Sequence, residues 1–292
     1  MDMRQLEAFC AIVELKSFSA AAKQLYISQP TISNHLHNLE KELNVRLMDR
    51  TTKTVIPTNE GYRLYEYAKS ILRLKKKAIA EFNDEDKPTI QLGASSIPSA
   101  YLLPGLVAGY LKIHNDVTFE IKQADSLVVI EQLKNGSIDI GITGSAYADD
   151  SLVCRPIYKD EMVLVTPATS RYMTYKNGRT SIKDILKNNP YIDREEGSGT
   201  KKRAEMYFET IKFDPDDLKI AARVNDLEAI KRFISCGMGV SILSKMVAAD
   251  MEKSGNALTF RLGREGVYRE YYLIYRKHRE LAFAKYIEGQ YR

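Results

Sequence analysis

Glycine is distributed very unevenly along this chain of 292 residues, and that distribution limits the folds it can adopt. Residues 1–87 contain one of the 16 glycines, Gly61, and all the others lie beyond. Glycine destabilises helix interiors and favours turns, so we expect a helical N-terminal unit followed by a unit rich in strands and turns. The polar segment Asn83–Pro88, closed by proline, is typical of a linker between them.

Residues 1–58 are predicted to form three short helices and a two-stranded hairpin, or wing. Apolar residues from Leu6 to Val13 recur at helical spacing, and a second helix follows at about 20–25. A third helix begins at Gln29, and its apolar residues form one narrow stripe: Ile32, Leu36, Leu39 and Leu43. Residues 46–58 are rich in β-branched side chains and show no helical stripe, which favours a hairpin.

The side of the third helix opposite the apolar stripe carries small polar side chains that can hydrogen-bond to base edges in the major groove. The residues expected to contact DNA there are Gln29, Pro30, Thr31, Ser33, Asn34, His37 and Asn38. In the wing, Arg46, Arg50 and Lys53 suit phosphates or a narrow minor groove. Ser17 and Ser19, near a helix start, are expected to hold a phosphate. A merely solvated face is the alternative, but it does not explain the absence of Glu and Lys from Gln29–Asn38.

A long helix is predicted for residues 59–82. Its apolar positions alternate at spacings of four and three, as in a coiled coil: Leu64, Ala68, Ile71, Lys75, Ala78 and Phe82. The helix either lies on its own domain or pairs with a second copy. We expect it to form a dimer, because few nearby residues could cover the seam.

From residue 89 onward strands alternate with helices, which predicts an α/β sheet with crossovers. Segments 152–158 and 162–166 are expected to be two separate strands. Loops after several strands lead into helices and offer hydroxyl and backbone N–H groups that could hold a small anion, although each alone could be an ordinary cap. The expected effector-binding residues are Ser95, Ser96, Ile97, Thr143, Gly144, Gly197, Ser198, Gly199, Thr200, Asn225 and Asp226.

Several other classes of protein are disfavoured. The three cysteines show no CxxC spacing, and His35 and His37 point about 160° apart on a helix, so neither a disulfide framework nor a metal site is expected. No nucleotide fingerprint, GxSxG or HExxH motif occurs, so we predict no cofactor, no catalytic residues and no enzymatic activity.

No apolar run approaches the about 20 residues of a membrane span, and no signal peptide is recognisable. We therefore expect a cytoplasmic protein without a membrane partner.

The net charge of +5 is concentrated at the N-terminal end. Residues 1–82 carry 13 Lys or Arg against 9 Asp or Glu, which leaves a net charge of +1 for the remainder. This excess points weakly to a polyanion as partner of the helical unit.

Residues 4–65 resemble the DNA-binding domain of LysR-type transcriptional regulators. The resemblance rests on Leu6-Glu7-Ala8-Phe9, Ser17-Phe18-Ser19-Ala20-Ala21-Ala22, Ser28-Gln29-Pro30-Thr31-Ile32-Ser33 and Thr58-Asn59-Glu60-Gly61. The sequence departs from the family at Asn34 and His37, where a basic residue is usual, and this bears on affinity and base preference. Ser95-Ser96-Ile97-Pro98 and Tyr101-Leu102-Leu103-Pro104 are similar to the sub-group that regulates sulfur and cysteine metabolism.

The resemblance implies that the second domain looks like a periplasmic binding protein with an effector between two α/β subdomains. The crossings would lie near 165–167 and 264–269, which gives one subdomain of residues 88–165 and 269–292 and another of residues 166–268. It also implies a tetramer, with RNA polymerase as a candidate partner.

We therefore expect an overall α/β protein with three parts. These are a winged helix-turn-helix domain (1–58), a linker and dimerisation helix with its hinge (59–87), and an effector-binding domain (88–292). Such a chain would bind a double-stranded DNA operator in response to a small, anionic metabolite. The alternatives are a cytoplasmic small-molecule-binding protein and an enzyme with an accessory helical domain.

Overall fold

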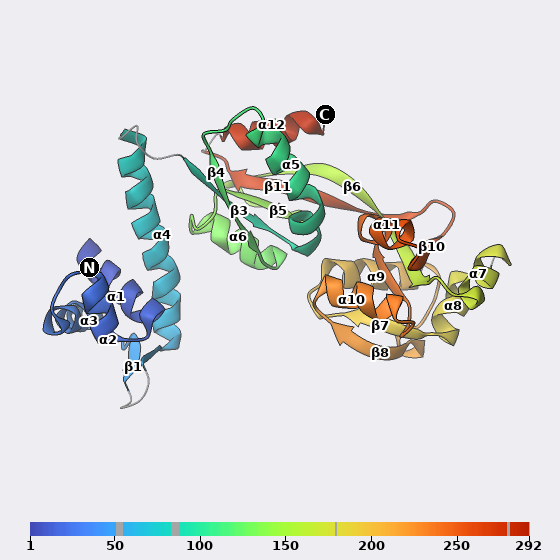
Figure 1. The fold of residues 1–292 in the computed structure, drawn as a ribbon, viewed down its shortest axis with the longest axis horizontal. Coiled ribbons are helices and arrows are strands. Elements are labelled where there is room, and N and C mark those ends of the chain that lie inside the picture. The colour runs from blue at the N-terminus through green and yellow to red at the C-terminus, as the bar shows by residue number, and fades with distance from the viewer. Residues whose placement is uncertain (51–54, 83–87, 179, 279–280, 292) are drawn as a thin grey trace. The chain divides into compact units, whose positions relative to one another are not determined.

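The computed structural model of the chain describes residues 1–50, 55–82, 88–178, 180–278 and 281–291, with the side chains of 50, 77 and 80–82 left out. The described residues form two compact units, the first comprising Met1–Pro88 and the second most of the chain from Thr89 onward (Figure 1). The Lys53 side chain, that of Arg50 and the hinge at 83–87 lie outside the described residues.

The first unit contains the predicted three short helices, the hairpin and the long helix. The elements are α1 (Met3–Leu15), α2 (Phe18–Gln24), α3 (Gln29–Leu43), β1 (Met48–Arg50), β2 (Val55–Pro57) and α4 (Asn59–Phe82). Strands β1 and β2 pair antiparallel. The side chains of Asp2, Ser17 and Ser28 accept hydrogen bonds from the first turns of α1, α2 and α3, as N-caps do.

The core of the first unit lies where the helical spacing placed it. Ile32, Leu36 and Leu39 of α3 are fully buried against α1. The inclusion of Leu43 in that stripe is wrong, because this side chain is 38% exposed. Helix α3 ends at Leu43, where Asn44 adopts the left-handed conformation, and this last turn lies outside the core.

Helix α4 also packs on its own domain. Ala68 is fully buried in the core, and Leu64 and Ile71 pack against it. The Lys75 ammonium donates to the Glu7 carboxylate at 3.0 Å. The seam with spacings of four and three is therefore occupied within the protomer along this half of the helix. A different face of α4 carries the exposed apolar residues Tyr67 and Leu74.

The second unit is built on a mixed seven-stranded sheet in the order β10-β6-β11-β5-β3-β4, with β9 also pairing with β6. Its strands are β3 (Thr89–Ala94), β4 (Thr118–Gln123), β5 (Ile140–Thr143), β6 (Leu152–Pro167), β9 (Ser241–Ser244), β10 (Ala257–Arg261) and β11 (Val267–Arg276). A parallel pair of strands, β7 (Pro190–Arg194) and β8 (Lys219–Val224), forms a separate sheet.

Helices cover these sheets, as the alternation of strands and helices predicted. They are a short π-helical turn (Pro98–Leu102), α5 (Leu103–Leu111), α6 (Ser126–Lys134), α7 (Ser170–Asn177), α8 (Ile182–Asn188), α9 (Gly199–Thr210), a 3-10 turn (Pro215–Asp217), α10 (Leu227–Ser235), α11 (Lys245–Lys253) and α12 (Ala282–Gln290). Helices α7 and α11 were not expected from the sequence.

Two long antiparallel strands, β6 and β11, join the two subdomains of this unit (Figure 1). At one end Tyr272–Tyr275 of β11 pairs with β5, and at the other end Met162–Val165 of β6 pairs with β9. Between these pairings Asp160 lies opposite Arg269. The subdomain boundaries drawn from the resemblance, at 165–167 and 264–269, stay a prediction.

The prediction of two strands at 152–158 and 162–166 is wrong, because β6 is continuous. The gap between the two predicted strands falls at Lys159-Asp160-Glu161, where three charged residues follow one another. The structure accommodates those charges within the strand. Asp160 is buried and pairs with Arg269, and Glu161 pairs with Lys245 and Arg261.

Candidate functional site

The outer face of α3 in the first unit is exposed along its length. Gln29, Pro30, Thr31, Asn34, His37 and Asn38 are exposed, and Ser33 is half-buried. The apolar face of the same helix is fully buried at Ile32, Leu36 and Leu39. From Gln29 to Asn38 the structure thus presents a polar face without charged side chains to solvent, as the spacing of the apolar residues predicted.

The two serines at the start of α2, Ser17 and Ser19, form a hydrogen bond with each other. The Ala20 N–H donates to Ser17 Oγ at 3.2 Å, and the hydroxyls of Ser17 and Ser19 lie 3.1 Å apart. The hydroxyls of Ser28 and Thr31 are 2.7 Å apart at the start of α3. Arg46 is exposed just before the hairpin. The N-termini of α2 and α3 therefore present hydroxyl groups and backbone N–H donors at the surface of the unit.

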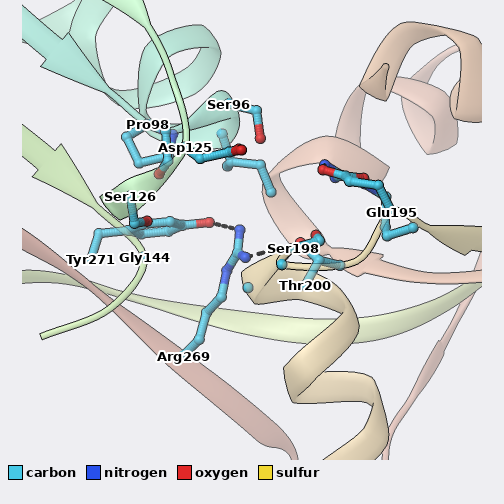
Figure 2. Close-up of a pocket in the computed structure, with 15 residues that line it drawn as sticks. Ser96, Pro98, Asp125, Ser126, Gly144, Glu195, Ser198, Thr200, Arg269 and Tyr271 are labelled. Carbon is cyan, nitrogen blue, oxygen red and sulfur yellow. Dashed lines mark hydrogen bonds and ion pairs between the residues drawn. The ribbon is translucent and has the colours of Figure 1, made fainter. Parts of the chain in front are cut away.

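A second candidate site is a pocket in the second unit, shown in Figure 2. It brings together eight of the residues predicted to bind an effector: Ser95, Ser96, Ile97, Gly144, Gly197, Ser198, Gly199 and Thr200. Residues from both subdomains face each other here, because the loop after β3 and the loop after β7 meet across the pocket. The sequence did not identify Asp125, Ser126, Arg194, Arg269 or Tyr271, which also line it.

Arg194 ends β7 and is almost completely buried at the pocket. Its Nε donates to Glu195 Oε2 at 2.7 Å, and its Nη2 donates to Glu195 Oε1 at 2.8 Å. The remaining nitrogen, Nη1, is buried and has no hydrogen-bond partner among the described residues. An unpaired buried donor costs free energy, so this nitrogen is available to a ligand.

The N-terminus of helix α9 lies beside Arg194. The N-cap Ser198 makes no side-chain hydrogen bond to the helix, and the preceding Gly197 has a φ of +85° that side chains rarely adopt. The first N–H groups of a helix have no intrahelical acceptors and carry a partial positive charge. The Gly197–Thr200 segment therefore supplies backbone donors to the pocket without a large side chain in the way.

Arg269 lies on the floor of the pocket and connects it to the long strands. Its Nη1 donates to Thr200 Oγ1 at 3.1 Å, its Nε donates to Asp160 Oδ2 at 3.3 Å, and its Nη2 donates to Tyr271 Oη. The Tyr271 hydroxyl in turn donates to Asp160 Oδ2 at 3.1 Å. Burial lowers the pKa of Arg269 to about 10, although the negative charge of Asp160 acts to raise it. Burial also raises the pKa of Asp160, although Ser244 and Arg269 oppose that shift.

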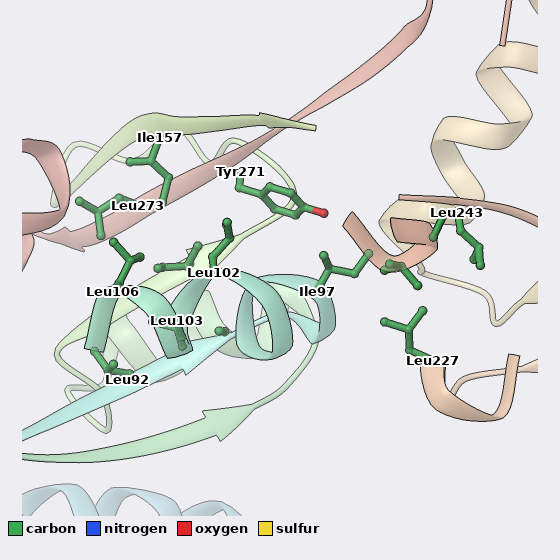
Figure 3. Packing of buried hydrophobic residues seen from close by; sticks show 14 of the residues in the cluster. Leu92, Ile97, Leu102, Leu103, Leu106, Ile157, Leu227, Leu243, Tyr271 and Leu273 are labelled. Atoms are coloured by element: carbon green, nitrogen blue, oxygen red, sulfur yellow. The ribbon is translucent and has the colours of Figure 1, made fainter. Parts of the chain in front are cut away.

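The pocket borders the apolar core of the unit. Ile97 and Tyr271 line the pocket and also belong to the core cluster that includes Leu227 and Leu243 (Figure 3). Their positions are therefore fixed by packing, which makes the wall of the pocket rigid.

Three predicted effector residues do not line this pocket. Thr143 is fully buried and its hydroxyl donates to the Ser145 carbonyl at 2.9 Å. Asp226 caps α10 by accepting from the Ala229 N–H at 2.7 Å, and Asn225 next to it is exposed. At Asp226 the observed role is the ordinary capping that the sequence also allowed.

The described residues contain no group of three or more His, Cys, Asp or Glu side chains that could hold a metal ion. They also contain no helix with the length and apolar character of a membrane span.

Two family models match the chain. The bacterial regulatory helix-turn-helix model of the lysR family covers residues 3–62, and the LysR substrate-binding domain model covers residues 83–285. Together they account for both units.

Similar proteins agree with these matches. The HTH-type transcriptional regulator MJ0300 of Methanocaldococcus jannaschii, itself uncharacterized, is 33% identical over 252 residues, covering 85% of this chain and 84% of its own. The HTH-type transcriptional regulator CysL of Bacillus subtilis is 31% identical over 245 residues, covering 83% of this chain and 80% of its own. The solved structure of full-length CbnR with its target DNA has the same fold, with a TM-score of 0.76 at 23% identity, covering 100% of this chain and 99% of CbnR. The chain belongs to the LysR family of DNA-binding transcriptional regulators, with an N-terminal helix-turn-helix domain and an effector-binding domain, and not to a family of enzymes.

Proposed function

We propose that this regulator reads operator DNA with the exposed face of α3 and responds to a small anionic effector bound in the pocket of the second unit. The observation that carries the effector proposal is the buried, unpartnered Nη1 of Arg194. The DNA proposal is supported by the opposite faces of α3, one fully buried and one exposed, with no Lys or Glu from Gln29 to Asn38. CbnR, which shares the fold, has been solved with its target DNA.

Three groups of donors favour an anion in the pocket. They are Arg194 Nη1, the backbone N–H groups at the start of α9, and the guanidinium of Arg269. Charge-assisted hydrogen bonds of this kind are about twice as strong as neutral ones. The relative QuiR, whose effector domain was solved with shikimate, is similar to 70% of this chain with a TM-score of 0.58 at 23% identity. An anion that touched both subdomains would favour one of their arrangements over another, as a regulatory ligand must.

Replacing Arg194 by methionine is expected to weaken anion binding at least about tenfold, because a charge-assisted hydrogen bond contributes about 1.5–3 kcal/mol. Sulfate, phosphate, acetate and shikimate serve as probes in a thermal-shift titration of the full-length protein, since a ligand raises the melting temperature of the state that it binds.

Arg223→Met is the matched control, because Arg223 lies on the neighbouring strand β8 with an exposed side chain that does not line the pocket. Equal affinities of the wild-type protein and Arg194→Met for every anion that binds would contradict the proposed site.

The second copy of the chain is proposed to pair along the face of α4 that carries Tyr67 and Leu74. These residues are seven apart, as equivalent coiled-coil positions are, and they are 56% and 45% exposed. Leu64, Ala68 and Ile71 pack within the protomer, whereas the face with Tyr67 and Leu74 is exposed and therefore open to a partner.

A Tyr67→Glu, Leu74→Glu double variant is expected to shift the protein towards monomers, since it places like charges in an apolar interface. Sedimentation velocity measures the change. Tyr62→Glu is the control, because Tyr62 is equally exposed, at 54%, on another side of the same helix. Dimers that persist in the double variant, at the same protein concentration, would rule this face out.

Three finer assignments remain predictions of the sequence. A tetramer and contact with RNA polymerase are implied by the resemblance. The sulfur and cysteine sub-group is supported by the sequences Ser95–Pro98 and Tyr101–Pro104 and by the identity to CysL.

A further inference from the structure

We infer that the effector is a small zwitterion that carries a cationic amine beside its anionic group, of about the size of a small amino acid. The inference rests on the proposed anion site and adds a second recognition element to it, the carboxylates of Asp125 and Glu195 in the pocket lining.

Asp125 and Glu195 line the pocket together with the two arginines. Asp125 immediately precedes α6 in one subdomain, and Glu195 follows β7 in the other. Figure 2 shows the two side chains entering the pocket from opposite sides, with Arg269 below them. The exposed Asp125 carboxylate makes no hydrogen bond or ion pair with any described residue. It is therefore an acceptor without a donor at the edge of a site otherwise rich in donors.

The charges around the pocket do not suit an anion alone. Arg194 is paired with Glu195, and Arg269 is paired with Asp160. Asp160 does not line the pocket, so the charged lining residues are Asp125 and Glu195 against Arg194 and Arg269, which leaves the lining without net charge. A simple anion would give this site a net negative charge in a partly desolvated environment, where like charges repel strongly. A zwitterion adds no net charge.

The two halves of a zwitterion match separate parts of the lining. Its carboxylate would accept from Arg194 Nη1 and from the N–H groups of α9, and its amine would donate to Asp125 and Glu195. The amine would then link carboxylates from the two subdomains. This gives the ligand a higher affinity for the arrangement that brings Asp125 and Glu195 together, which is the requirement for a conformational signal.

The size of the pocket limits the ligand further. The space open to water-sized groups is about 40 Å³. At about 10–15 Å³ for each water position, this is room for about three waters, whose share of liquid volume is about 90 Å³. A molecule such as glycine, alanine or serine fits that space, whereas pockets for drug-sized ligands measure about 300–1,000 Å³.

The test uses the full-length protein and the common L-amino acids in a thermal-shift screen, followed by calorimetry. Each amino acid that binds is compared with the same acid lacking the amine, for example alanine with propionate. We expect at least one small amino acid to bind about 10- to 100-fold more tightly than its counterpart without the amine, because that amine makes charge-assisted hydrogen bonds.

Asp125→Asn is the decisive variant, because it keeps the shape of the side chain and removes its charge. It is expected to weaken binding of the amino acid about tenfold and to strengthen binding of the acid without the amine. Asp150→Asn, at an exposed aspartate away from the pocket lining, is expected to change neither affinity.

The inference is overturned if no amino acid binds, if the acids without the amine bind equally well, or if Asp125→Asn leaves the preference unchanged. In each of these cases the proposed anion site stands as long as Arg194→Met weakens the binding of anions. If Arg194→Met changes the affinity for no anion and no amino acid, the proposed effector function itself fails.

Discussion

Replacing Asn34 by alanine is expected to weaken binding to the operator about 10- to 100-fold, because one bidentate contact to a base contributes about 1–3 kcal/mol of discrimination. Asn34 is exposed on the outer face of α3, one turn after the exposed Pro30. Its side-chain amide can both donate to and accept from an adenine edge. An operator selected from random-sequence duplexes and a fluorescence-anisotropy titration at fixed salt measure the effect.

The salt dependence separates base contacts from phosphate contacts. Asn34→Ala should leave the slope of log affinity against log salt unchanged and should reduce the preference for the operator over random DNA. Asn188→Ala, at an exposed helical asparagine of the second unit, is the control. If Asn34→Ala and Pro30→Ala both bind the operator as the wild type does at the same salt, α3 is not the recognition helix.

The elements that were predictable from the sequence are those whose signals are local. The stripe of Ile32, Leu36 and Leu39 sets which face of α3 is buried, and therefore also which residues face outward. The wrong prediction for Leu43 also has a local cause. Helix α3 ends at Leu43 because Asn44 caps it, and the spacing of apolar residues does not show where a helix ends.

Features that depend on distant residues were missed. Two strands were predicted with a gap at Lys159–Glu161, yet β6 is continuous there, and Arg269, more than one hundred residues later, pairs with Asp160. The sequence identified one apolar seam on helix α4, and the structure shows a second face with the exposed Tyr67 and Leu74. Which one is covered by α1 depends on the packing of the whole unit, and spacing alone selected the seam that the domain itself uses.

The effector pocket also combines residues that have local sequence signals with residues that depend on distant pairing. Loops that follow strands and open helices were identified from their composition, and eight of their residues meet in the pocket. Asp125 follows β4 and Ser126 is the first residue of α6, so the same signal of a strand followed by a helix start could have found them. Arg269 and Tyr271 come from within β11, and only the pairing of that strand with β6 brings them to the pocket.

Replacing Asp160 by alanine is expected to destabilise the second unit by about 3–5 kcal/mol, because it leaves the buried Arg269 guanidinium without its counter-charge. The side chains of Asp160 and Arg269 are 1% and 5% exposed, and the Asp160 carboxylate also accepts from Tyr271. Removing both charges in an Asp160→Ala, Arg269→Met double variant should restore most of the loss, since the cost arises from an unpaired buried charge and not from the missing attraction.

Urea unfolding followed by near-ultraviolet circular dichroism of the tyrosines measures these differences. Asp217→Asn is the control, because Asp217 and Lys187 form an exposed ion pair at 3.9 Å, which contributes at most about 1 kcal/mol. A loss in Asp160→Ala no larger than that of the control would mean that water reaches Arg269 at the junction of the subdomains. A double variant as unstable as Asp160→Ala would instead mean that the packing of these two side chains, rather than their charges, holds β6 and β11 together.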